Sequence, residues 1–496
     1  MACAPTARNH LAAFSWARLC MLTARRRSSG RIIHRLFTLR RCFALLATFV
    51  AVSFLLSAFP EAPKRLLGIR AGPLYLLLRL KMRRLPQHNL SLPFPEGKTG
   101  RYVRFRVESN FIGWNNCLNE RLMNAHLAYA TNRAYTFSDY WWPTEHYPFK
   151  PWPEGGVHTP SPSLLGGPVV GGSWGSTPPA DLDAPYPHPP RAILWEWFDV
   201  VCPPETRRNF TTGDVKPTTP GGADASGLAT FQHWRKLLLD APERCVEISA
   251  GPSGGTWPQI FGLELFGGQR VLDLWDEFSR SPVSTTLRPS PLVHRAVEAN
   301  LASGVLSGKK KTRFWGTAET DDPFPRMLAF HLRRGDYIQH CQNLLDYGAG
   351  YYGWAQLPFL PDVVNQRLEK ATEREARMAM CLPDVAGMVR RIEEVSRDWQ
   401  SAEKTRKLEI IYLLTNESGP FLGQVVEALG RAGRPVVVTT RNLHLTNEQF
   451  EVSMAVDMEI AKRAAVFVGN GWSSFTSNVI HQRLVAGHEP ASIRHT

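Results

Sequence analysis

Apolar and polar positions alternate most regularly in the carboxyl third of the chain, between residues 408 and 486. Short leucine- and valine-rich runs end at turn residues, and in the intervening segments apolar residues recur every three or four positions. The pattern predicts strands at 408–416, 435–440 and 466–470, and helices at 420–433, 450–465 and 474–486. This order is typical of a doubly wound parallel α/β sheet, which binds ligands beyond the carboxyl ends of its strands. Asn416, Thr440 and residues 469–474 fall at those ends.

A second α/β layer is predicted to begin near residue 101. Residues 101–107 alternate as a strand does, and residues 135–138 read as the next strand. Between them, apolar residues recur at helical spacing (Leu118, Leu122, Leu127 and Ala130). Strand, turn, helix and strand open a parallel layer.

Two segments interrupt the pattern. Residues 143–190 are dense in proline and glycine, so we expect them to form neither helix nor sheet. Residues 303–325 look like a second, shorter insertion. A loop as long as the first is usually functional or disordered.

The amino-terminal head has a different character. Residues 42–59 contain no charged side chain and follow Arg40 and Arg41. Eighteen helical residues span about 27 Å, close to a thin bilayer core, and the preceding arginines predict a cytoplasmic amino terminus. We expect a cytoplasmic tail (1–41), a transmembrane anchor (42–59) and a stem (60–99) before a lumenal body. A cleaved signal peptide, a transit peptide and a buried core helix are the alternatives.

The net charge of +14 is confined to this head. The first 100 residues carry 17 basic and two acidic residues, which leaves about −1 for the remaining 396. The body is therefore almost neutral, and the sequence predicts no nucleic-acid partner.

The cysteines and sequons are compatible with a secretory lumen. The body has five cysteines, so at most two disulfides and one free thiol can form, and we expect Cys341 to pair with Cys381. Asn89, Asn209 and Asn416 begin N-x-S/T triplets that permit glycosylation.

Three turns are rich in groups that bind anions. Residues 469–476 (GNGWSSFT) lead from a strand into a helix, so free N–H groups and the helix dipole would meet an anion there, with Ser473, Ser474 and Thr476 adding hydroxyls. The alternative is an ordinary turn with a serine N-cap. A dinucleotide fingerprint is excluded, because the third glycine is absent.

The other two turns supply complementary donors. The apolar run 327–330 leads into HLRRGD (331–336), where His331 and Arg333 share one face of the strand by period two and Arg334 takes the other. Arginine suits bidentate contact with a phosphate. Because the two arginines lie on opposite faces, we expect one of them to be structural, with Asp336 as its partner. GWNN (113–116) adds a glycine for close backbone approach and two amide side chains.

One further pattern is rejected as a metal site. Asp181 and Asp183 have the DxD spacing of metal-dependent glycosyltransferases. They lie in the proline- and glycine-rich insertion rather than at a strand end, and about one such triplet is expected by chance in a chain of this length.

Together these motifs resemble the GDP-fucose protein O-fucosyltransferase superfamily and its fungal relatives, over roughly residues 100–490. The matching stretches are GWNN followed by a long helix, HLRRGDY (331–337) and VDMEIAKRAAVFVGNGWSSF (456–475), of which the last is the most specific. The resemblance implies a GT-B architecture, with one Rossmann-like domain at 100–325, including the insertion 143–190, and a GDP-sugar-binding one at 326–496. It also implies inverting transfer of fucose from GDP-fucose to a protein Ser/Thr or a glycan, without a metal or other cofactor.

The resemblance also implies roles for single residues. Arg333 would bind the β-phosphate and stabilise the departing GDP, the catalytic role. His331 would line the same site, and Asp457 would bind the nucleoside. The diphosphate would be held by Ser473, Ser474 and Phe475. Gly113 and Asn115 would complete the donor site from the amino-terminal motif.

The sequence departs from the family in two places. Some members carry a glutamate just before the first glycine as a candidate general base, and here that position is Ile112. Glu108, Asp139 and Asp336 are the nearby carboxylates, and the choice among them stays open. The insertion at 143–190 is unlike the animal enzymes, so their acceptor is not carried over.

The sequence is therefore interpreted as a single-pass type II glycosyltransferase of the Golgi or endoplasmic reticulum membrane. Two alternatives remain: a catalytically silent lumenal protein that binds a GDP-sugar or a glycan, and a transferase that uses another GDP-sugar.

Overall fold

The computed structural model describes residues 73–496 apart from 111, 144–145, 148–157, 175–188, 254, 256, 309–321, 336, 363–370, 403–406 and 435. Contacts divide the chain after Arg70, and all of the described residues belong to the compact unit from Ala71 to Thr496. The predicted tail (1–41) and anchor (42–59) lie outside the described residues. Among the residues that are described, no helix is long and apolar enough to cross a bilayer.

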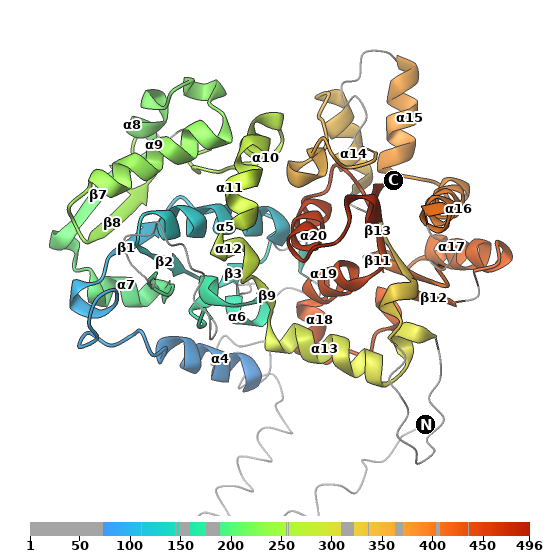
Figure 1. Cartoon of the computed structure of the whole chain (residues 1–496), viewed down its shortest axis with the longest axis horizontal. Helices are drawn as coiled ribbons and strands as arrows, with labels where there is room; N and C mark the ends of the chain where they lie inside the picture. Colours follow the sequence, from blue (N-terminus) through green and yellow to red (C-terminus); the bar gives the residue numbers. More distant parts are fainter. Residues whose placement is uncertain are drawn as a thin grey trace, which may run out of the picture. The chain divides into compact units, whose positions relative to one another are not determined.

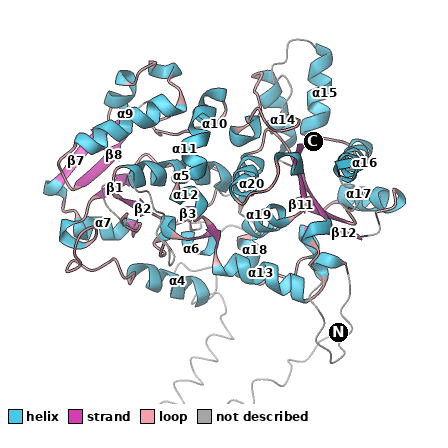
Figure 2. Cartoon of the chain, viewed as in Figure 1, coloured by secondary structure: helices cyan, strands magenta, loops and turns pink. Residues whose placement is uncertain are grey.

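The fold is a mixed α/β arrangement built on two parallel sheets of five strands each, with helices around both (Figures 1 and 2). The first sheet and its surroundings comprise α4 (Pro73–Arg83), β1 (Tyr102–Phe105), α5 (Trp114–Ala130), β2 (Ala134–Phe137), β3 (Tyr140–Trp141), β4 (His158–Thr159), α6 (Ser161–Leu164), β5 (Leu165–Gly166), β6 (Ile193–Leu194), α7 (Trp195–Val201), β7 (Arg207–Thr211), α8 (Thr212–Val215), α9 (Gly227–Asp240), β8 (Cys245–Ser249), α10 (Leu263–Phe266), α11 (Trp275–Arg280), α12 (Pro282–Thr285), β9 (Arg288–Pro289) and α13 (Pro291–Ala302).

The second sheet is formed by the rest of the chain. Its elements are β10 (Met327–Leu332), α14 (Tyr337–Asp346), α15 (Ala371–Cys381), α16 (Val385–Ala402), β11 (Ile410–Thr415), α17 (Pro420–Arg431), β12 (Val436–Thr439), α18 (Asn447–Glu451), α19 (Ser453–Arg463), β13 (Val466–Gly469), α20 (Ser474–Val485) and β14 (Ile493–His495).

In the first sheet the strand order is β6-β2-β1-β8-β7, and all neighbours run parallel. The strands predicted at 101–107 and 135–138 and the helix between them are confirmed as β1, β2 and α5. Every residue of β1 and β2 is buried, because helices cover both faces of a parallel sheet.

In the second sheet the order is β12-β11-β10-β13-β14, again parallel throughout. The chain therefore builds outward from β10 in one direction to β12 and then returns to place β13 on the other side of β10. Such a reversal is a topological switch point, where the loops after the two central strands diverge and leave room for a ligand. The predicted strands and helices between residues 408 and 486 are confirmed within a few residues.

Helices join the two sheets within the compact unit. α5 packs against α20, and α13 packs against α19. A hydrogen bond of 2.5 Å between Ser284 Oγ and His481 Nε2 adds a buried contact between α12 and α20. The division into domains at 100–325 and 326–496 stays a prediction.

The prediction that residues 143–190 form neither helix nor sheet is wrong for part of that range. Residues 158–166 form β4, α6 and β5. They are held by buried contacts: the Thr159 hydroxyl donates to the Glu451 carboxylate, and Trp142 Nε1 donates to Thr159 Oγ1 at 2.7 Å. These side-chain contacts supply the stabilisation that the local composition lacks.

The predicted stem (60–99) also needs correction. Residues 73–83 form α4, and Tyr75 and Met82 on its inner face are 2% and 3% exposed. Tyr75 Oη donates to the Glu448 carbonyl at 3.5 Å. From residue 73 onward the segment is part of the folded unit, because one side of this helix packs against the hydrophobic core.

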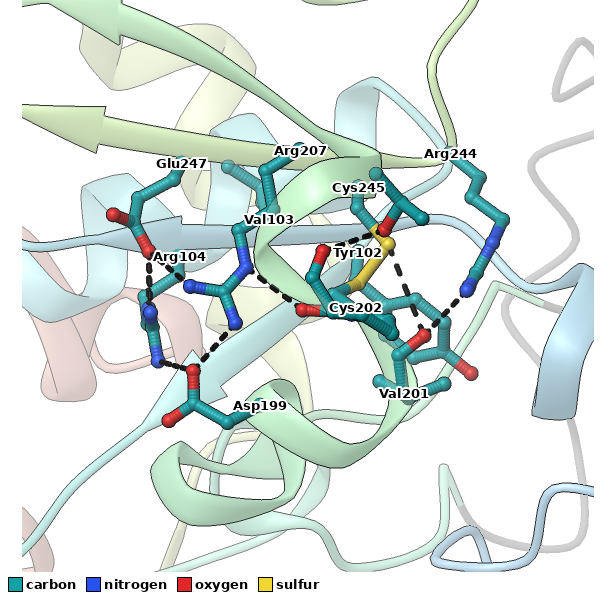
Figure 3. The surroundings of a disulfide bond; sticks show 12 residues. Tyr102, Val103, Arg104, Asp199, Val201, Cys202, Arg207, Arg244, Cys245 and Glu247 are labelled. Atoms are coloured by element: carbon teal, nitrogen blue, oxygen red, sulfur yellow. Dashed lines mark hydrogen bonds and ion pairs between the residues drawn. A yellow bond between two sulfur atoms is a disulfide. The ribbon is translucent and has the colours of Figure 1, made fainter.

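Two disulfides are present in the described part of the chain. Cys341–Cys381 confirms the predicted pair, and Cys117 is a buried free thiol. Cys202–Cys245 joins the end of α7 to β8 (Figure 3). Beside it, Arg104 Nε donates to Glu247 at 2.8 Å, and Asp199 accepts from Arg104 at 2.9 Å and from Arg207 at 2.6 Å.

Candidate functional site

The candidate site lies at the switch point between β10 and β13. His331 is the second-last residue of β10, and Arg333 and Arg334 follow that strand directly. On the other side of the switch, β13 ends at Gly469, and the turn 470–473 leads into α20. The structure thus brings two of the three predicted anion-binding turns to adjacent strand ends.

The first turn of α20 is not capped in the ordinary way. Ser473 occupies the N-cap position, yet its hydroxyl makes no capping hydrogen bond. Ser473 is 2% exposed, and among the described residues its Oγ has no hydrogen-bond partner. The first N–H groups of a helix have no partner within the helix, so this end of α20 offers backbone donors and an unused hydroxyl together. This arrangement favours an anion site over the ordinary serine N-cap.

The turn is held in place by close packing. Tyr352 N–H donates to the Gly471 carbonyl at 2.8 Å. A Cβ on Gly471 would lie 2.5 Å from the Tyr351 ring, so no larger residue fits there. Trp472 is fixed through Nε1, which donates to the Ala349 carbonyl at 2.9 Å. The backbone of the turn is therefore pre-organised by the segment after α14.

His331 lies against the same helix turn. Its Nδ1 is 3.2 Å from Thr476 Oγ1, and its ring centroid is 4.7 Å from that of Phe475. Burial, with the neighbouring charge of Arg333, lowers the pKa of His331 to about 3. His331 is therefore a neutral hydrogen-bonding group at physiological pH and not a cation.

The two arginines after β10 are used differently. The Arg334 guanidinium donates to the Pro383 carbonyl at 3.0 Å and stacks over Phe421 at 3.8 Å, so Arg334 is the structural one. Arg333 lies over the Tyr337 ring at 4.8 Å, and Tyr337 Oη donates to Asn470 Oδ1 at 3.4 Å. This chain of contacts places Arg333 beside the turn that precedes α20. Asp336, which the sequence suggested as the partner of the structural arginine, lies outside the described residues.

Asp457 is buried on α19, and its side chain bonds to Tyr412 of β11 and to Thr440, which follows β12. Its Oδ1 accepts from Tyr412 Oη at 2.5 Å, and its Oδ2 accepts from Thr440 Oγ1 at 2.9 Å. Burial raises the pKa of Asp457 to about 7, although these hydrogen bonds and the charge of Arg441 act in the opposite direction. When ionised, this carboxylate would accept further hydrogen bonds from a ligand with N–H groups.

The third predicted turn reaches the site from the first sheet. Asn478 Nδ2 on α20 donates to the Asn115 carbonyl at 2.9 Å and to its Oδ1 at 3.3 Å. GWNN is thus held one helical turn along α20 from Ser474. A Cβ on Gly113 would meet no atom of the described residues closer than 3.9 Å. Packing within the described residues therefore gives no reason for a glycine at position 113.

The carboxylates left open by the sequence differ in their environments. Asp139 is paired with Arg79 at 3.1 Å. Glu108 is buried between Arg121 Nε, at 3.0 Å, and Tyr135 Oη, at 2.5 Å. Both are committed to structural contacts.

A further carboxylate, Glu120 on α5, was missed by the sequence analysis. Its Oε2 accepts from the Ser109 N–H at 3.0 Å, but its buried Oε1 has no partner in the described part of the chain. Burial and the neighbouring charge of Glu108 raise the pKa of Glu120 to about 8. The sequence gives no signal for it, because an acidic residue in the middle of a helix usually faces solvent.

Other contacts of the site were also missed. Asn478 and Tyr412 each fix a predicted site residue, Asn115 and Asp457 respectively. Asn478 could have been found, since it lies within the first turns of the helix that Ser474 begins. Tyr412 is inside a continuous apolar strand and gives no such signal.

The described residues include no cluster of three or more His, Cys, Asp and Glu side chains that could hold a metal ion. Asp181 and Asp183 lie outside them.

No protein-family model matches the sequence, and no curated protein matches it significantly. Several solved structures align with the chain at low identity. POFUT1 in complex with GDP-fucose aligns with a TM-score of 0.47 at 15% identity, over 80% of this chain and 98% of that one. POFUT1 in complex with GDP gives 0.46 at 16% identity, over 80% and 98%. An arginine-to-lysine mutant of Arabidopsis thaliana FUT1 in complex with GDP gives 0.31 at 12% identity, over 86% and 74%.

Proposed function

We propose that this chain is a glycosyltransferase of GT-B architecture that transfers fucose from GDP-fucose, with inversion and without a metal, to a protein Ser/Thr or a glycan. The observation that carries the proposal is the first turn of α20. Its uncapped N–H groups and the buried Ser473 hydroxyl, unpartnered within the described residues, lie at a switch point beside Arg333. Backbone N–H groups, hydroxyls and one arginine are the groups that bind a diphosphate where no metal neutralises it.

In this proposal each residue has a defined task. Ser473, Ser474 and the N–H groups around Phe475 hold the diphosphate. Arg333 forms a bidentate contact with the β-phosphate and stabilises the charge that develops on GDP as the bond to the sugar breaks. His331, kept neutral by burial, adds a hydrogen bond without adding charge.

The rest of the donor would lie between the two sheets. Asp457 would accept hydrogen bonds from the N–H groups of the guanine base. Gly113 and Asn115 would meet the donor from the first sheet, and the open space at Gly113 permits close approach of a ligand to the backbone.

We further propose that the chain is a single-pass type II protein of the Golgi or endoplasmic reticulum, with the body in the lumen. The apolar segment 42–59 and the arginines before it support this orientation. The disulfides Cys202–Cys245 and Cys341–Cys381 support an oxidising compartment.

The experiment that tests the reaction is donor hydrolysis by the purified full-length chain, with a panel of GDP-sugars and in the presence of EDTA. Preferential release of GDP from GDP-fucose supports the proposal. Equal turnover of several GDP-sugars would contradict the donor assignment. The alternative, a silent lumenal binding protein, is favoured by Ile112 at the position of the family's candidate base. It predicts binding of GDP without turnover of any donor.

A further inference from the structure

Helix α4 carries apolar side chains on two sides. On its inner side, Tyr75 and Met82 are buried, and Leu74 and Leu78 pack against the core. On its outer side, three leucines are exposed to solvent, by 40% at Leu76, 61% at Leu77 and 41% at Leu80. At about 100° per residue, these three fall within one arc of about 100°.

This group of leucines is unusual in the described part of the chain. The other large apolar side chains that are exposed are scattered, mostly one to an element (Phe94, Val200, Leu239, Trp257, Ile338, Tyr347 and Phe359). Scattered exposed apolar residues are normal, whereas a contiguous set marks an interaction surface. Since the inner side already anchors the helix, the outer leucines are not needed for folding.

The charges on the same outer side indicate what the surface contacts. Lys81, Arg83 and Arg84 are exposed, and residues 73–84 contain no acidic residue. A helix with leucines and cations side by side is the pattern of a segment that lies in the interface of an anionic bilayer. A second copy of this chain would bring the same cations face to face across a two-fold axis, which disfavours self-association through α4.

The position of α4 in the sequence supports the same partner. Thirteen residues separate the apolar stretch 42–59 from Pro73. A chain of that length spans at most about 45 Å when extended. If residues 42–59 cross a membrane, as proposed above, α4 is tethered within reach of its surface.

We infer that the outer side of α4 (Leu76, Leu77, Leu80, Lys81, Arg83 and Arg84) docks onto the surface of the membrane in which the chain is anchored. The leucines enter the boundary between headgroups and acyl chains, and the cations contact anionic headgroups.

Docking through α4 would orient the site. Arg79 on this helix donates to Asp139 at 3.2 Å and to the His158 carbonyl at 3.2 Å. Tyr75 Oη donates to the carbonyl of Glu448, which lies on α18, the helix before α19. α4 is thus bonded to elements around the first sheet and to elements around the second. Its attachment to a membrane would therefore hold the donor site in one orientation relative to the bilayer.

The test places a photo-crosslinking residue, p-benzoylphenylalanine, at position 77 of the full-length chain in vesicles of phosphatidylcholine and phosphatidylserine. Leu239 on α9, which is 43% exposed, provides the matched control position. We expect lipid adducts, measured by mass spectrometry, to be at least about tenfold more abundant at 77 than at 239. The yield at 77 should fall severalfold in the Lys81→Glu/Arg83→Glu variant.

Equal adduct yields at 77 and 239, or crosslinks at 77 to a second copy of the chain, would overturn the inference. A yield unchanged by the charge reversal would contradict the electrostatic part. The inference rests on the proposed anchor, which is tested separately by extraction of the membranes with alkaline carbonate. Release of the chain by carbonate would refute the anchor, whereas the adducts report on α4 itself.

Discussion

Replacement of Asp457 by asparagine should raise the stability of the ligand-free protein while it abolishes GDP binding. Burial raises the pKa of Asp457 from 3.8 to about 7. Below pH 4 the carboxyl is protonated in both the folded and the unfolded state, so its ionisation does not change the free energy of unfolding. Between pH 4 and pH 7 the unfolded chain ionises first, so the free energy of unfolding falls as the pH rises. Above pH 7 the carboxyl is ionised in both states, and the free energy of unfolding no longer falls with pH.

The size of the effect follows from the two pKa values. A difference of about three corresponds to about 4 kcal/mol, at 1.36 kcal/mol for each pKa unit, as an upper limit. The asparagine side chain would be neutral at every pH and would keep hydrogen-bonding capacity toward Tyr412 and Thr440. We therefore expect the Tm of Asp457→Asn at pH 7.5 to exceed that of the wild type by roughly 3–6 °C. At pH 4 the two proteins should melt together.

Thermal melting with and without GDP measures both halves of the prediction. GDP should raise the Tm of the wild type, because a ligand that binds only the folded state stabilises it, and should not raise that of the variant. Glu459 lies on the same helix but forms an ion pair with Lys462, so Glu459→Gln is the matched control and should not be stabilised. A lower Tm for Asp457→Asn than for the wild type at pH 7.5 would refute the reasoning, since the carboxylate would then be a net stabiliser.

Three further predictions concern the site and the fold. Arg333→Lys should lose most of its activity, nearly as much as Arg333→Ala, because a point charge cannot replace the planar bidentate fork; near-normal turnover would exclude the phosphate role. Gly113→Ala should melt like the wild type, since a Cβ there meets no described atom closer than 3.9 Å, but should weaken GDP-fucose binding in calorimetry if the donor approaches this backbone. Burial would raise the pKa of Asp362, but hydrogen bonds from Arg494 and the charge of Arg391 lower it. Asp362→Asn should therefore lower the free energy of unfolding by on the order of 2 kcal/mol at neutral pH, as measured by chemical denaturation. The difference from the wild type should shrink as the pH falls toward 3.

Much of the fold follows from local patterns. The strands and helices between residues 408 and 486 were predicted because each strand is apolar on both faces and each helix has a clear apolar stripe. The site could be predicted in outline for the same reason. In a parallel sheet the carboxyl ends of the strands lie at one edge, so the HLRRGD and GNGWSSFT turns were expected to meet there, and His331 does contact Thr476.

Features that depend on distant contacts could not be predicted. The insertion is ordered around Thr159 because this residue bonds to Glu451, which is 292 positions away in the sequence. β14 is three residues long and carries too little periodicity to be recognised. α4 was mistaken for a stem because a leucine-rich basic segment gives the same local signal whether or not it packs against a core.

The most direct test of the proposed donor site is calorimetric titration of GDP into the full-length protein in EDTA, with Arg333→Ala and Arg326→Ala as paired variants. Arg326 immediately precedes β10 at the opposite end of the same strand and forms an ion pair with Glu409 at 2.8 Å, so it controls for the loss of an arginine. We predict that GDP binds the wild type and Arg326→Ala alike in EDTA and that binding is lost in Arg333→Ala. Unchanged binding in Arg333→Ala, or binding that EDTA abolishes, would contradict the account.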